Sequence, residues 1–328
     1  MKKYIYIIGV MLLAVMTACT NEDIVPSSEN MALTEGDLIE QISFTVPELE
    51  MDDVSTRGFY NDDGEKLTFL WSNYSSGNGL FKADTIGVFP MKTLSYYDQV
   101  FFPIVETTNS NTAFFDGLGW GLRKGYTYGA YYPYNFNYRN YQKIPIDYTG
   151  QRQFANKSTR GCLSQYDFMA SGRITPENDQ LVIPMTRIGA IVQVELDFND
   201  YITGLGSNAP ESIDFVEFTL GTNESVFALH GSVNLSATTP VYSPDNNNKT
   251  SSVSMELSWP SYVYSIWTDN ASWGWKVTLY MALPPTDLTG KTLTATLIGN
   301  DGKKYVANLE GGKNIEAGKA YKFAGTYS

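Results

Sequence analysis

Short runs of alternating apolar and polar residues recur along most of the chain. The clearest is QISFTV at residues 41–46, where Ile42, Phe44 and Val46 share one face and Pro47 ends the run. Comparable runs follow after short polar gaps; they are KLTFLW, DTIGVF, TAFFD, YTYGAYY, YDFMAS, LVIPM, AIVQVELDF, DFVEFTL, VTLYMAL, TLTATLI, KKYVANL and AYKFAGTY. This alternation predicts a β-strand in each run.

The residues between the runs are typical of turns. Gly, Asn, Asp, Ser and Pro fill gaps such as NDDGE, SNYSSGNG and GNDGKK. No window of helical length keeps an apolar period of about 3.6 residues, and Thr, Tyr, Val, Ile and Phe dominate the runs. We therefore expect an all-β protein of antiparallel β-sandwiches, because a parallel sheet would need long helical crossovers.

The length of the chain favours two domains. A chain of 328 residues, of which 43% are hydrophobic, can bury two cores of ordinary size and is too long for a single sandwich. The stretch GRITPENDQ at residues 172–180 divides a Tyr-rich first half from a second half rich in Thr, Val and Leu. The expected domains are an N-terminal β-sandwich over residues 38–175 and a C-terminal one over residues 176–328.

Residues 1–18 have the pattern of a secretory signal peptide. Lys2 and Lys3 precede an apolar run that is too short to span a bilayer comfortably, and small residues follow before Cys19. A cysteine at this boundary predicts a bacterial lipoprotein whose lipid is attached to Cys19; a transmembrane segment is the alternative. Residues 19–37 are polar and acidic and predict a flexible tether, so the expected location is the outer membrane at the cell surface.

Charge and side-chain inventory exclude several classes of function. The formal net charge of -12 argues against binding nucleic acid or anionic lipid, since both need a basic surface. If Cys19 is acylated, Cys162 has no disulfide partner, and one cysteine with one histidine, His230, cannot form a usual zinc site. We therefore expect no cofactor, no metal and no enzyme, although a pair of carboxylates that converge for glycoside hydrolysis stays open.

An aromatic run, YTYGAYYPYNFNYRNY, occupies residues 126–141. Tyrosine rings exposed in a row can stack on sugars; alternatively, alternate tyrosines of the run pack the core of a sandwich. The candidate glycan contacts are Tyr126, Tyr128, Tyr131, Tyr132 and Tyr134.

A single basic residue interrupts an acidic stretch. Between Cys19 and Lys66 the only Lys or Arg is Arg57, in the sequence VSTRG, with Gly58 directly after it. The residues alone fit a solvated loop arginine and a protease site equally well.

Five stretches together resemble the fimbrillin family, the fimbrillin-like (Mfa-like) subunits of type V pili. They are VSTRG after the first strand, LTFLWS followed by ADTIGVFP, YGAYYPY, YDFMAS, and the closing segment from LYMALPPTDLTG to EAGKAYKF. Their order and spacing cover nearly all of the chain from Ile42 to Phe323. The sequence departs from the family at IPMTRIGAIVQV, where many relatives carry a histidine and this chain carries Arg187.

This resemblance implies two tandem transthyretin-like β-sandwiches and a route of assembly. Pilins of this family reach the surface as lipoproteins, and an arginine-specific surface protease cuts after an arginine that follows the first strand. In this sequence cleavage between Arg57 and Gly58 would release the segment from Cys19 onward, with Ile42, Phe44 and Val46. A strand from another pilin subunit, in a homopolymer or heteropolymer, would then fill the apolar slot.

The resemblance thus predicts a structural and adhesive pilus subunit without catalytic activity. The terminal strand AYKFAGTY either is the donor strand, or the subunit donates none and sits at a pilus tip. An uncleaved member would stay lipid-anchored at the base. The competing hypothesis is a lipid-anchored surface protein that binds glycans; the surface to which the protein adheres is not specified by the sequence.

Overall fold

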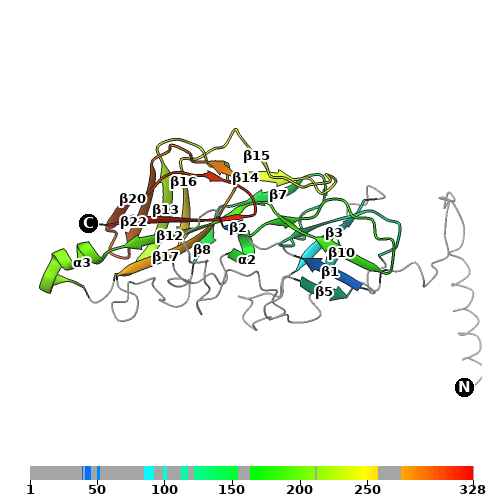
Figure 1. Ribbon diagram of the computed structural model, residues 1–328, viewed down its shortest axis with the longest axis horizontal. Helices are drawn as coiled ribbons and strands as arrows, with labels where there is room; N and C mark the ends of the chain where they lie inside the picture. The colour runs from blue at the N-terminus through cyan, green and yellow to red at the C-terminus, as the bar shows by residue number, and fades with distance from the viewer. Residues whose placement is uncertain are drawn as a thin grey trace, which may run out of the picture. The chain divides into compact units, whose positions relative to one another are not determined.

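The computed structural model describes residues 39, 41–45, 50–51, 85–91, 99–101, 112–116, 122–153, 163–210, 213–257 and 275–327. These residues belong to one compact unit, Gly36–Ser328. Within the described ranges the chain is mainly β-strand, interrupted by the short helices α2 (Leu163–Tyr166), α3 (Asn199–Leu205) and η3 (Gly206–Asn208). The all-β class is therefore confirmed (Figure 1).

Two sheets contain most strands of the first part of the chain. In a three-stranded sheet, β1 (Gln41–Thr45) lies between β10 (Gln180–Pro184) and β5 (Thr112–Asp116). A five-stranded sheet has the order β11 (Thr186–Arg187), β9 (Met169–Ala170), β6 (Tyr128–Tyr132), β3 (Ile86–Pro90) and β4 (Gln99–Phe101). Six of these eight strands match predicted runs, whereas β4 and β11 were not predicted. The predicted run KLTFLW lies outside the described residues.

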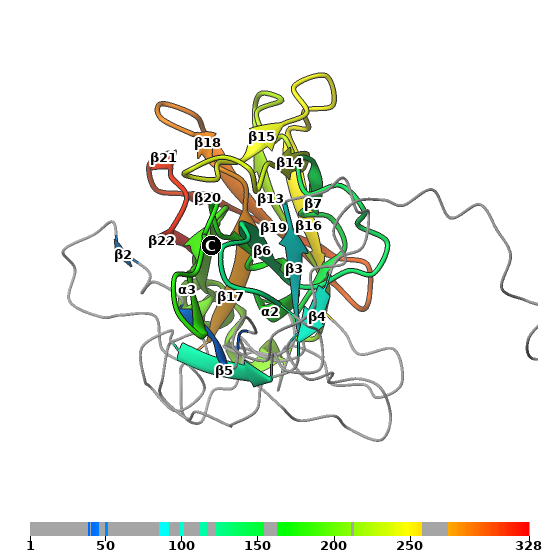
Figure 2. The ribbon, with the colours of Figure 1, turned by 90° about the vertical axis from the view of Figure 1, so that its right-hand side faces the viewer.

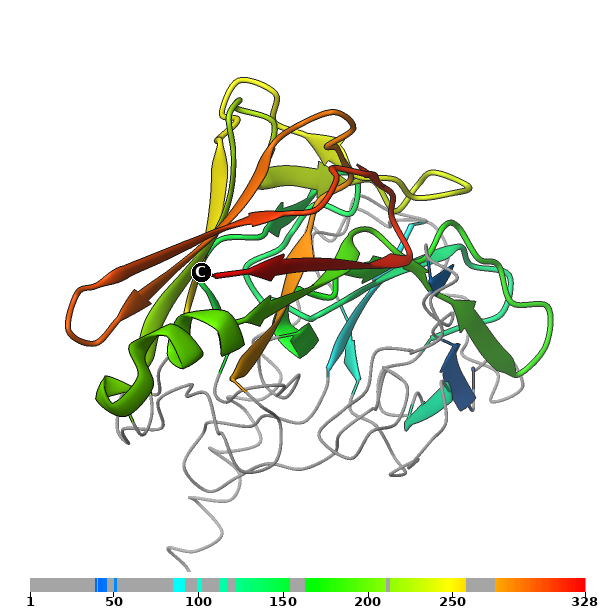
Figure 3. The ribbon, with the colours of Figure 1, turned by 60° about the vertical axis from the view of Figure 1, so that its left-hand side comes forward.

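The second part of the chain builds a nine-stranded sheet. Its order is β17 (Lys276–Leu283), β12 (Ala190–Asp197), β22 (Lys319–Thr326), β20 (Lys304–Leu309), β19 (Leu293–Gly299), β13 (Phe215–Thr222), β16 (Ser252–Glu256) and β8 (Gln151–Arg152), and β2 (Glu50–Met51) pairs beside β22. In Figure 3 the dark red strand β22 ends at the C-terminus. Every run predicted after residue 185 is a strand here.

Two small sheets complete the described part. One has the order β15 (Ser243–Pro244), β14 (His230–Val233) and β7 (Ile144–Asp147). The other joins β18 (Thr286–Asp287) to β21 (Asn314–Ile315), which lie side by side in Figure 2. These strands and β16 were not predicted from the sequence, because each is short and contains Pro, Gly, Asp, Asn or Ser, which are more typical of turns.

Most strand pairs of the described residues are antiparallel, as the sequence predicts. Four pairings among these residues are parallel and were not expected: β1 with β10, β12 with β22, β2 with β22, and β8 with β16. Each joins segments far apart in the sequence, so the strands between them serve as the crossover that a parallel pair requires. Long helical connections are therefore unnecessary.

Strands from before residue 175 enter sheets built mainly from strands after it. β7 pairs with β14, and β8 pairs with β16. The predicted division into domains at residues 175 and 176 stays a prediction, but these pairings tie the two parts of the chain together through backbone hydrogen bonds.

Two buried glutamines connect β8 and the residue after it to the opposite end of the large sheet. The Gln151 side-chain amide accepts a hydrogen bond from the Ala282 backbone amide at 2.8 Å and donates to the Ala282 carbonyl at 2.8 Å. The Gln153 amide likewise accepts from Tyr280 N at 2.7 Å and donates to Thr278 O at 3.0 Å. Because β17 is the terminal strand of the sheet order, the two side chains satisfy backbone groups at its edge.

The buried apolar side chains form two clusters. The smaller cluster surrounds β1 and includes Ile42, Phe44, Val88, Tyr128 and Ile183. The larger cluster lies mainly among strands of the nine-stranded sheet but also contains Phe89 and Tyr131 from the first part of the chain. Adjacent residues of β3 and of β6 thus point into different clusters, as expected for strands covered on both faces.

Arg187, the residue at which the sequence departs from the fimbrillin pattern, forms a buried ion pair. Its side chain is 2% exposed, and its Nε donates to both carboxylate oxygens of Asp167 at 3.1 Å. Burial raises the pKa of the Asp167 carboxyl, and the adjacent guanidinium opposes that rise. The pair joins β11 to the short segment between α2 and β9.

Replacing Arg187 with Met should lower the free energy of unfolding by about 3–5 kcal/mol, because the Asp167 charge is then buried without its partner. Chemical denaturation of the purified protein measures this loss. The matched control is Arg173→Met at an exposed position, which should change stability by less than about 0.5 kcal/mol. Equal effects of the two substitutions would contradict a structural role for the ion pair.

Candidate functional site

The predicted removable strand β1 occupies the centre of its sheet. It pairs in parallel with β10, placing Ile42 beside Leu181 and Phe44 beside Ile183. On its other edge it pairs antiparallel with β5 over all five residues (Figure 1). Both edges of β1 are therefore engaged in backbone hydrogen bonds, so loss of β1 would leave one unpaired edge on β5 and another on β10.

The side chains of β1 alternate as the sequence predicts. Ile42 and Phe44 are fully buried, whereas Ser43 is partly buried and Thr45 is exposed. Val46, the third member of the predicted apolar face, lies outside the described residues. The strand thus fills a slot with alternate side chains, as an added strand does in recognition by β-augmentation.

The walls of this slot are apolar on both neighbouring strands and on the sheet beneath. Ala113 of β5 and both Leu181 and Ile183 of β10 are fully buried. They belong to the same cluster as Ile86 and Val88. Burial of a side chain the size of Ile or Phe contributes about 1.5–3 kcal/mol, so Ile42 and Phe44 together supply several kcal/mol that an empty slot would lack.

Backbone contacts hold the two ends of the strand. The Ile39 amide donates to the Leu122 carbonyl at 2.8 Å, and the Met185 amide donates to the Thr45 carbonyl at 2.9 Å. The Thr45 and Thr112 hydroxyl oxygens lie 3.4 Å apart across the β1–β5 pair. Removing β1 would therefore expose polar backbone groups as well as apolar side chains.

A second strand, β2, lies on the same stretch of chain before Arg57. Its backbone pairs in parallel with β22, Glu50 beside Lys319 and Met51 beside Ala320. This strand was not predicted from the sequence, because it is only two residues long and lies among Glu and Asp, which are depleted in strands. The stretch before Arg57 thus contributes strands to two different sheets.

The residues predicted for export and processing lie outside the described ranges. These are Cys19, Arg57 and Gly58. Their predicted roles in lipidation and proteolysis stay predictions.

Three of the five tyrosines proposed as glycan contacts are core residues. Tyr128, Tyr131 and Tyr132 are at most 2% exposed, so a sugar cannot stack on their rings. The Tyr128 hydroxyl donates to the Arg123 carbonyl at 3.0 Å and accepts from the Arg123 amide at 2.7 Å. The alternative prediction from the sequence, that tyrosines of this run pack the core, is therefore confirmed for these three residues.

Tyr126 and Tyr134 are partly exposed. The Tyr134 ring packs against Tyr131, with a centroid distance of 6.4 Å, so it is an extension of the core. Residues 126–134 therefore do not form a row of exposed rings. Successive side chains of β6 point to opposite faces of the sheet, and a cluster of buried apolar side chains covers each face.

The only histidine lies at the start of β14. His230 is exposed, and its Nδ1 lies 3.4 Å from Asp147 Oδ1. Among the described residues, no group of three or more His, Cys, Asp or Glu is placed to hold a metal ion. No helix in the described ranges is long and apolar enough to span a membrane.

No protein-family model matches this sequence, and no curated protein matches it. Among solved structures, a "putative cell adhesion protein" from Bacteroides uniformis has a TM-score of 0.51 and 13% identity, covering 88% of this chain and 93% of that chain. Another "putative cell adhesion protein", from Bacteroides ovatus, has a TM-score of 0.49 and 16% identity over 88% of this chain and 92% of that one. A "fimbrial protein" from Bacteroides ovatus has a TM-score of 0.35 and 13% identity, covering 90% and 50% respectively.

The similarity to the Bacteroides uniformis structure extends over nearly the whole length of both chains and shows a shared fold. The other two scores are too low to carry an argument. The chain therefore has the fold of a protein described as a cell adhesion protein, in agreement with the fimbrillin resemblance of its sequence motifs.

Proposed function

We propose that this protein is a structural and adhesive subunit of a type V pilus, related to the fimbrillins and without catalytic activity. The observation that carries the proposal is the position of β1. β1 lies in the middle of its sheet and fills an apolar slot. It precedes Arg57, which is the only Lys or Arg between Cys19 and Lys66. The fold shared with the Bacteroides uniformis protein supports a role at the cell surface.

In the proposed route, the precursor is exported as a lipoprotein and held in the outer membrane through Cys19. An arginine-specific surface protease cuts after Arg57, and the released segment takes β1 and β2 with it. A strand from another subunit, the same or different, then pairs with β5 and β10 and buries its alternate side chains in the slot. The cell-surface fimbrium is the resulting location.

The source of the donor strand has two alternatives. β22 pairs with β12 from Ala320 to Thr326 and buries Tyr321 and Phe323, so it is an integral strand of its own sheet. If β22 is the donor, it has to leave this sheet, and release of β2 would free part of its edge. If β22 stays, the subunit accepts a strand without donating one, as a pilus tip requires.

A lipid-anchored protein that is never cleaved is the second candidate, either as a pilus anchor or as a glycan-binding surface protein. In that case β1 would be a permanent part of the core. The buried state of Ile42 and Phe44 fits a permanent strand as well as a removable one, so processing decides between the candidates.

The full chain made in the bacterium that produces it should start at Gly58 after maturation. Mass spectrometry of the N-terminal peptide measures this directly. Arg57→Gln should retain an acylated Cys19 and abolish polymer ladders on gels, because the protease lacks its arginine. The control Arg173→Gln, at an exposed position elsewhere, should be processed normally. A wild-type protein found only with acylated Cys19 would rule out the cleavage route.

Phe44→Ala should lower the free energy of unfolding of the uncleaved protein by about 3–5 kcal/mol, since a fully buried ring is replaced by a cavity. After cleavage the substitution should have no effect on the assembled subunit, because residue 44 has left with the released segment. Chemical denaturation of the precursor and of the polymer measures the free energy of unfolding in the two states. Ser43→Ala, on the other face of β1, should be near neutral in each state. A deficit that persists in the processed protein would show that β1 remains in place.

A further inference from the structure

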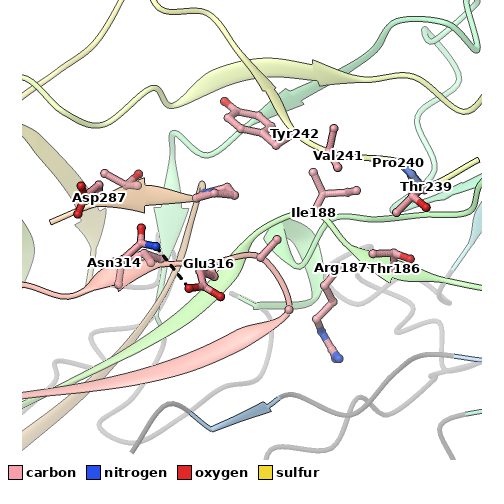
Figure 4. A pocket seen from close by; sticks show the side chains of 15 residues that line it. Thr186, Arg187, Ile188, Thr239, Pro240, Val241, Tyr242, Asp287, Asn314 and Glu316 are labelled. Atoms are coloured by element: carbon pink, nitrogen blue, oxygen red, sulfur yellow. Dashed lines mark hydrogen bonds between the residues drawn. The ribbon is translucent and has the colours of Figure 1, made fainter. Parts of the chain in front are cut away.

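A groove of about 660 Å³ lies between four segments that are distant in the sequence. These segments are residues 186–188, 239–242, 285–287 and 314–318. Figure 4 shows side chains from all four around the opening. The volume is in the range of sites for small ligands.

One wall of the groove carries exposed polar groups. Asp287 of β18 and Asn314 of β21 are neighbours in the strand pair, and the Asn314 side-chain amide donates to Glu316 Oε1 at 3.4 Å. The Asp287 carboxylate accepts from the Thr289 amide at 2.9 Å, and contacts with Thr289 hold its pKa below the usual value. This wall thus presents an ionised carboxylate, an amide and a second carboxylate, all exposed.

The opposite wall is mainly apolar and fixed in position. The Tyr242 hydroxyl donates to the Ala228 carbonyl at 2.6 Å, and its ring packs edge-on against Tyr148 with centroids 5.9 Å apart. Pro240 and Val241 adjoin it, and Val241 is 69% exposed, the highest fraction among the exposed large hydrophobic residues described. An aromatic ring, a proline and an exposed valine form an apolar surface beside the polar wall.

The charge of the lining selects among ligands. Arg187 is the only Lys or Arg among the lining residues, but its guanidinium is bonded to Asp167 and extends away from Tyr242 in Figure 4. The exposed charged residues of the lining are Asp287 and Glu316, and Glu316 Oε2 lies 2.8 Å from Lys319 Nζ, which is not a lining residue. Acidic groups repel phosphates, sulfates and carboxylated sugars.

We propose that this groove binds a neutral oligosaccharide, with sugar hydroxyls on Asp287, Asn314 and Glu316 and the apolar face of a sugar ring against Tyr242 and Val241. Sugars combine hydroxyl edges with C–H faces, and the two walls supply one partner for each. The inference rests on the proposed adhesive function and names the chemical class of its ligand. A basic peptide, which would also suit the two carboxylates, is the rival occupant.

Saturation-transfer NMR on the purified full chain tests the proposal. The probes are the neutral trisaccharides cellotriose, maltotriose and mannotriose, with sialyllactose as an anionic comparator and trilysine as a basic peptide. Two variants change opposite walls at exposed positions: Asn314→Ala removes the amide, and Val241→Asp removes the apolar surface. Asn223→Ala, at an exposed position outside the groove, is the matched control.

The expected result is transfer to at least one neutral trisaccharide, with affinity about tenfold lower in each groove variant and unchanged in Asn223→Ala. Transfer to none of the three neutral sugars, equal binding of sialyllactose, preference for trilysine, or unchanged binding in both groove variants would overturn the proposal. Polymer formation by the same variants is followed in parallel. If Asn314→Ala loses sugar but still assembles, the ligand site and the pilus function are separated; loss of assembly in the wild type would instead overturn the proposed function.

Discussion

The fold depends on a strand that is hydrogen-bonded on both edges. β1 supplies backbone partners to β5 and β10 and two fully buried side chains to the smaller core. An edge strand could leave a sheet at the cost of one row of hydrogen bonds, but a central strand leaves two open edges and an empty apolar slot. In the proposed function that vacancy drives polymerisation, because another subunit's strand restores the same contacts.

Most of the larger core does not depend on β1, as strand exchange in the proposed function would require. The larger core lies mainly in a different sheet from β1, and its strand order is closed by Gln151 and Gln153 at the edge of β17. Buried amides in this position satisfy backbone groups that would otherwise face an apolar interior. The buried pair of Arg187 and Asp167 adds a polar contact that is costly to break from one side only.

Adhesion and assembly would use different parts of the molecule. The assembly slot is apolar and long, and recognition there depends on backbone pairing with alternate side chains. The groove beside Tyr242 is short and lined by side-chain oxygens and amides, features that suit a sugar. The groove adjoins β22 through residues 314–318, so it would keep its shape in a polymer only if β22 stays in its own sheet.

Alternation of apolar and polar residues was enough to predict the β class, the positions of the long strands and the inward face of β1, because alternation such as that of Ile42 and Phe44 is a local property. It did not determine that β1 is central, that four strand pairs are parallel or that three tyrosines of the aromatic run are buried. Those features depend on partners that are distant in the sequence, such as Ala113 and Ile183 beside Phe44. The groove could not be predicted from the sequence at all. Four distant segments form it, and none of them carries a recognisable motif. Their side chains come together only after the strands have paired.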